Sequence, residues 1–149
     1  MKRTVLCLLT IWVICLTISC TSNNIYINRE QDKREGKILL DKFYANINSK
    51  NYDAVDGMVG DSLKHLAGPS GISGMTKFIN GKVGNYKDYK IVDMYIRCVI
   101  GDNNEKSYNY KLKVTYDKGV IDEIIGFKQQ DGSDIKINSY HANSDLLIH

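Results

Sequence analysis

The spacing of apolar residues changes once along the chain, near Gly84, and this change limits the fold more than any other feature. Before Gly84, apolar residues recur every three or four positions, which is the period of a helix buried on one face. After Gly84, they alternate with polar residues, which is the period of a strand. Helices followed by antiparallel strands predict an α+β domain with the helices on one face of the sheet.

The helical half begins with a long amphipathic stretch. Asn28 stands where an N-cap is expected, and the helix is predicted to end near Ser49. Shorter helices are predicted around Val55, after Gly60, and over residues 72–83. The apolar face of the long helix consists of Gly36, Leu39, Leu40, Phe43 and Ile47.

Four strands are predicted after Gly84. The segments between them are rich in Asn, Asp and Gly, which is the composition of hairpin turns. The sequence therefore predicts an antiparallel meander over residues 89–101, 106–116, 120–129 and 133–141.

The N-terminus has the layout of a secretory signal peptide. Lys2 and Arg3 precede an apolar run, residues 4–18, that is shorter than the ~20 residues of a membrane-spanning helix. The run ends at Ser19-Cys20 and resembles a bacterial lipoprotein signal, in which the Cys is acylated and becomes the first mature residue. A simple secretory signal and an uncleaved anchor are the alternatives.

Removal of residues 1–19 changes the charge and the cysteine count. The net charge of the whole chain, +3, is already too even for a dedicated nucleic-acid binder. The mature chain loses Cys7 and Cys15, so that only Cys98 remains beside the acylated Cys20. We therefore expect a fold without an internal disulfide, held at the membrane through Cys20 by more than one acyl chain.

The order of these segments is similar to that of a known family. Phe43-Tyr44 in the long helix, residues 50–55 after it, and residues 132–140 at the end resemble small bacterial lipoproteins of the nuclear-transport-factor-two-like superfamily, also called cystatin-like or ketosteroid-isomerase-like. The resemblance implies a curved sheet that wraps around the first helix as a cone, encloses a pocket and often dimerises. The predicted units are a signal peptide at 1–19, the lipidated Cys and a tether at 20–29, the domain at 30–143 and a tail at 144–149.

The parity of the first predicted strand, residues 89–101, decides what faces the pocket. In the second predicted strand, residues 106–116, Tyr108 and Tyr110 belong to a row of apolar side chains that must face inward. A hairpin loop of odd length pairs this row with Val92, Met94, Ile96, Cys98 and Ile100. A loop of even length would bury Asp93 and Arg97, at a cost of several kcal/mol per ion. We favour the odd loop, which places Tyr95 and Arg97 on the outer face as a candidate interface.

Glu123 belongs to the row of side chains in the third predicted strand, residues 120–129, that is the more apolar and therefore the better candidate for the inner face. That row contains Ile121, Ile125 and Phe127, whereas the alternative row would bring Asp122 inward. A carboxyl group beside tyrosines in an apolar pocket would have the raised pKa that a general acid or base requires. Alternatively, a bulge or a strand end lets Glu123 reach water. Tyr44, Tyr108 and Tyr110 are the other candidate pocket residues.

Motifs for metal, nucleotide or covalent chemistry do not stand out. His65, His141 and His149 do not have the spacing of a zinc site, and Cys98 has no CxxC partner. The glycines between Gly68 and Gly74 lack the strand and the Lys-Ser or Lys-Thr pair of a phosphate loop. No cofactor, metal or catalytic residue is therefore assigned.

Three functions stay open. The chain is expected to be a lipid-anchored, non-catalytic protein of the cell envelope that binds a small hydrophobic ligand or a protein partner. The alternatives are an acid–base enzyme that uses Glu123 with Tyr44 or Tyr110, and a dimeric scaffold that pairs through the sheet face. Thr21 after the cysteine resembles lipoproteins sorted to an outer membrane facing the periplasm, if the cell has one. Otherwise the outer face of the cytoplasmic membrane is expected.

Overall fold

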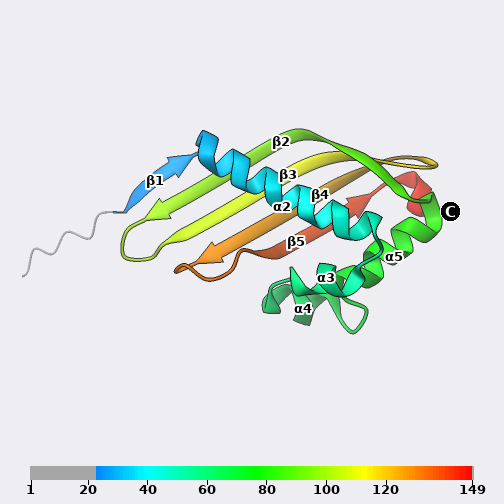
Figure 1. The fold of residues 1–149 in the computed structure, drawn as a ribbon, viewed down its shortest axis with the longest axis horizontal. Coiled ribbons are helices and arrows are strands. Elements are labelled where there is room, and N and C mark those ends of the chain that lie inside the picture. The colour runs from blue at the N-terminus through cyan, green and yellow to red at the C-terminus, as the bar shows by residue number, and fades with distance from the viewer. Residues whose placement is uncertain (1–22, 149) are drawn as a thin grey trace, which may run out of the picture.

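The computed structural model describes residues 23–148 and shows an α+β fold (Figure 1). Four helices precede four long antiparallel strands, as the change of period predicts, and one short strand comes before them. The predicted signal peptide and Cys20 lie outside the described residues. The elements are β1 (Asn24–Ile27), α2 (Glu30–Asn48), α3 (Tyr52–Gly57), α4 (Asp61–Ala67), α5 (Gly71–Val83), β2 (Tyr86–Ile100), β3 (Glu105–Tyr116), β4 (Gly119–Gln130), β5 (Lys136–Asn143) and the 3₁₀ helix η1 (Asp145–Leu147).

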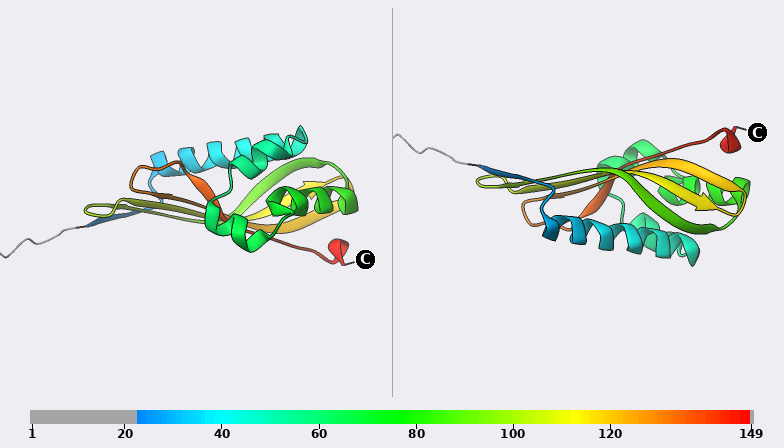
Figure 2. Two further views of the ribbon diagram at one scale, coloured as in Figure 1. Left: turned by 90° about the horizontal axis from the view of Figure 1, so that it is seen from below. Right: turned by 90° about the horizontal axis from the view of Figure 1, so that it is seen from above.

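The strands form one antiparallel sheet in the order β1-β2-β3-β4-β5. Helix α2 lies along one face of this sheet, and α3 to α5 gather near the end away from β1 (Figures 1 and 2). The sheet is neither closed nor strongly curled, so the cone that the family resemblance implies is not formed. Long strands joined by short hairpins satisfy their hydrogen bonds in an open meander and do not by themselves require closure.

The predicted tether, residues 20–29, contributes a strand to the sheet. β1 pairs with the end of β2, from Asn24 opposite Ile100 to Ile27 opposite Arg97. Asn28 does not act as the predicted N-cap. It adopts a positive φ of 50° and exchanges hydrogen bonds with Ile96, 2.9 Å through its backbone N–H and 2.8 Å through its side-chain oxygen. The chain thereby turns from the sheet edge into α2, whose N-cap position is held by Arg29.

The register between β2 and β3 confirms the odd parity. Met94 lies opposite Tyr110 and Ile96 opposite Tyr108, so the apolar row and the tyrosine row share the inner face. The prediction is wrong for Val92, which is 58% exposed. An irregularity in the pairing between Ile91 and Asp93 shifts the parity there, as a β-bulge does.

Gly36 lets α2 approach the sheet closely. A Cβ atom at this position would lie 1.8 Å from the hydroxyl oxygen of Tyr110 and 2.9 Å from Cδ1 of Tyr108. Only a residue without a side chain fits there, because both tyrosines are buried. Farther along the helix, Leu40, Phe43 and Ile47 complete the core between α2 and the sheet, as predicted.

Candidate functional site

Glu123 lies at the centre of a cluster of tyrosine hydroxyls. It extends from β4 toward α2, and Tyr44 of α2 donates a hydrogen bond of 2.9 Å to its Oε2. Tyr140 of β5 donates to the same oxygen at 2.8 Å, and Tyr116 of β3 donates to Oε1 at 2.8 Å. One carboxyl group therefore joins a helix and three strands, with both of its oxygens accepting hydrogen bonds.

The Glu123 cluster is closed to solvent. Glu123 is 1% exposed, and Tyr44 and Tyr116 are also buried. Burial raises the pKa of the Glu123 carboxyl, and the hydrogen bonds from Tyr140, Tyr116 and Tyr44 oppose that rise. The inner-row prediction for Glu123 is confirmed. The carboxyl group is thus not exposed to solvent, and its hydrogen bonds hold the elements of the fold together.

The other two candidate pocket residues lie in the core toward the start of α2. The Tyr108 hydroxyl donates to Glu35, which also pairs with Lys106 at 2.8 Å. The Tyr110 hydroxyl is buried against Gly36 and has no hydrogen-bond partner. Tyr108 and Tyr110 thus face inward as predicted, but the structure does not bring them together with Glu123 around an open space.

Buried tyrosines predict unfolding at alkaline pH. Burial raises the pKa of Tyr86 and of Tyr110 to about 12, and it also raises the pKa values of Tyr44, Tyr116 and Tyr140. Because a tyrosine of the unfolded chain titrates near pH 10, the stability from these protonated groups is complete below about pH 10 and is lost as the pH rises above it.

We therefore expect the absorbance of tyrosinate to rise cooperatively above about pH 10, together with the loss of far-ultraviolet circular dichroism. Both signals are recorded in one pH titration. Complete ionisation of the tyrosines with an unchanged circular dichroism spectrum would contradict the prediction.

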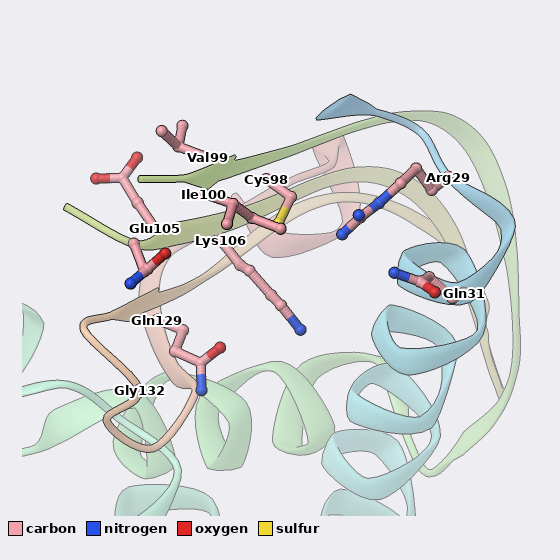
Figure 3. Close-up of a pocket in the computed structure, with 10 residues that line it drawn as sticks. Arg29, Gln31, Cys98, Val99, Ile100, Glu105, Lys106, Gln129 and Gly132 are labelled. Atoms are coloured by element: carbon pink, nitrogen blue, oxygen red, sulfur yellow. The ribbon is translucent and has the colours of Figure 1, made fainter. Parts of the chain in front are cut away.

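A surface hollow of about 400 Å³ lies where the ends of the strands extend beyond the start of α2 (Figure 3). Its floor is the end of β2 with the apolar Ile100 and the buried thiol of Cys98, whereas the side chain of Val99 points to the other side of the strand (Figure 3). Its walls come from the start of α2, the start of β3 and the turn after β4. The lining residues are Arg29, Gln31, Cys98, Val99, Ile100, Asn104, Glu105, Lys106, Gln129 and Gly132.

The charged groups around this hollow are already paired. Arg29 contacts Asp32 at 2.6 Å, Lys106 contacts Glu35 at 2.8 Å, and Glu105 contacts Lys128 at 2.8 Å. Paired charges have little tendency to attract a strongly charged ligand. The side-chain amides around the hollow and its apolar floor suit a ligand that is partly apolar and uncharged.

The outer face of the sheet carries the predicted interface residues. Tyr95 is half exposed there, and Arg97 pairs with Glu105 at 3.5 Å. Cross-strand pairs of Asp93 with Lys111 at 3.2 Å and of Asp122 with Lys113 at 2.7 Å lie on the same face. The structure thus confirms the outward orientation of Tyr95, and a partner would meet a face of mixed, largely balanced charge.

Residues 23–148 contain no group of three or more His, Cys, Asp or Glu side chains placed to hold a metal ion. Within the same residues, no helix has both the length and the apolar character needed to cross a membrane.

Comparisons with known proteins match no family model, no curated protein and no solved structure. The structure itself supports the α+β order of the predicted family resemblance. It also adds the hollow, which sequence reasoning missed. Gln31 and Gln129 lie far apart in the chain, and neither belongs to a motif. The one sequence signal for the hollow was that neighbouring strands must bring their ends together. Which residues meet there depends on the lengths of the turns, which the sequence left open.

Proposed function

We propose that this chain is a lipid-anchored, non-catalytic protein of the cell envelope whose domain binds a small, partly apolar ligand in the hollow beside the start of α2. One observation carries the proposal. The side chains around Glu123 are buried, whereas the hollow is concave, open to solvent and floored by apolar side chains. Its volume is within the range of about 300–1,000 Å³ that is typical of small-molecule sites.

The anchor is supported by the sequence alone. Replacement of Cys20 by Ser is expected to move the protein from the membrane fraction to the soluble or secreted fraction, because the acyl chains supply the attachment. Cell fractionation and intact-mass measurement of the full chain check this result. The matched control is Cys98→Ser, which leaves the acylation site unchanged. Retention of the Cys20→Ser protein in membranes would contradict the lipoprotein assignment.

The ligand site is tested with two isoleucines of equal exposure. Ile100 in the hollow and Ile124 on the outer face are each 44% exposed on a strand. The full chain, purified from membranes in a mild detergent, is expected to carry an additional non-covalent mass in native mass spectrometry. We expect Ile100→Trp to lose this mass by filling the hollow and Ile124→Trp to keep it. If both variants keep the additional mass equally, the hollow is not the binding site.

We also propose a superfamily for the domain and, as a second candidate function, a homodimer. The order of helices and strands is consistent with the nuclear-transport-factor-two-like superfamily. A homodimer through the outer face is the second candidate function, favoured by the exposed apolar side chains of Val92, Tyr95 and Ile124 on or beside that face. Sedimentation of the full chain in detergent as a monomer at high concentration would remove this candidate.

A further inference from the structure

We infer that the edge strand β1 lies against the lipid surface and orients the domain on the membrane. This inference rests on the proposed acylation of Cys20. All four residues of β1 are exposed, and three of them, Ile25, Tyr26 and Ile27, are large and apolar. Ile100, the partner of Asn24 at the same end of the sheet, is exposed as well.

The covalent geometry of the chain keeps this strand close to the anchor. Only three residues separate Cys20 from Asn24, the first residue of β1. Consecutive Cα atoms are at most about 3.8 Å apart, so Cys20 and Asn24 lie within about 15 Å of each other in any conformation. A domain held by acyl chains at Cys20 must therefore keep the β1 end of the sheet at the membrane surface.

The chemistry of this end fits a lipid surface better than water. β1 is an edge strand, and an exposed apolar edge promotes association unless something covers it. Residues 23–28 contain no acidic side chain that anionic headgroups would repel. Arg29, which pairs with Asp32, lies over the ring of Tyr26 at 4.4 Å, and Arg97, which pairs with Glu105, lies opposite Ile27 in the sheet. Carboxylates balance these cations, so the exposed apolar side chains of β1 carry the contact with lipid.

Spin labels test this orientation on the full chain. Ile25→Cys places a label on β1, and Phe78→Cys places the matched label on α5, near the other end of the molecule (Figure 1). The native side chains are 55% and 51% exposed, respectively, so each label occupies a surface position. Cys98 is buried and is therefore protected from labelling. The labelled proteins are reconstituted in vesicles of phosphatidylethanolamine and phosphatidylglycerol. Relaxation by oxygen, which enters lipid, is then compared with relaxation by a water-soluble nickel complex.

We expect the ratio of oxygen relaxation to nickel relaxation to be several-fold higher for the Ile25→Cys label than for the Phe78→Cys label. Equal ratios at the two positions in an acylated protein would overturn this inference alone. Spin–spin broadening of the Ile25→Cys label without lipid contact would also overturn it, because β1 would then be covered by a second copy. An intact mass without acyl groups would overturn the anchoring proposal, and this inference with it.

Discussion

Replacement of Glu123 by Ala is expected to lower the free energy of unfolding by about 3 kcal/mol or more, because it leaves three buried hydroxyl groups without their acceptor. Each buried donor without a partner costs about 1–3 kcal/mol, and the lost side-chain volume adds to that cost. Urea unfolding followed by circular dichroism measures the effect. A loss below about 1 kcal/mol would show that the tyrosine hydroxyls find other partners.

The isosteric Glu123→Gln variant separates the charge from the hydrogen bonds. Burial raises the pKa of Glu123 in the folded protein. The stability that this group contributes is therefore complete below its ordinary pKa, near 4, and is lost as the pH rises through the folded pKa. We expect the wild-type protein to lose stability relative to Glu123→Gln as the pH rises above about 4. A difference that grows in favour of the wild-type protein over that range would mean that the carboxylate is stabilised instead.

Replacement of Gly36 by Ala is expected to destabilise the fold by about 1–3 kcal/mol, although alanine favours helices. The new methyl group would overlap the Tyr110 hydroxyl and crowd Tyr108, both of which are buried. Gly81 in α5 provides the control, because a Cβ atom there would meet nothing within 4 Å. Gly81→Ala should raise the stability by about 0.5–1 kcal/mol through helix propensity alone.

The Tyr110→Phe substitution tests the cause of the Gly36 effect. The Tyr110 hydroxyl has no hydrogen-bond partner, so its removal should cost little by itself. It also removes the atom nearest to the new methyl group and should recover part of the stability lost in Gly36→Ala. An additive double mutant in thermal or urea unfolding would show that the two residues do not clash.

Periodicity was sufficient to predict the helices, the long strands and the inner face, because each depends on the residues of one segment and its neighbour. The odd loop followed from the cost of burying Asp93 and Arg97, and the pairing of Met94 with Tyr110 confirms it. Val92 was misplaced because the irregularity beside it has no sequence signature. β1 was missed because four residues without alternating polarity do not reveal a strand when its partner, near Ile100, lies so far along the chain.

The candidate site could be predicted only in part. The inward orientation of Glu123 followed from its strand, but its three donors come from α2, β3 and β5 and are brought together only by the fold. The closed interior follows from the packing of α2 on a sheet that does not curl. Gly36 was placed on the inner face of α2 by its spacing, whereas its contact with Tyr110 depends on how closely the helix approaches the sheet.

Hydrogen exchange on the full chain tests most directly the claim that the interior is closed and that the hollow is the binding site. The protein as purified from membranes is compared with the same protein after its non-covalent ligand has been extracted. We predict that extraction increases exchange at the end of β2, the start of β3 and the first turn of α2, which line the hollow. Changes concentrated instead around Glu123, Tyr44 and Tyr140 would contradict it, because the ligand would then occupy the interior.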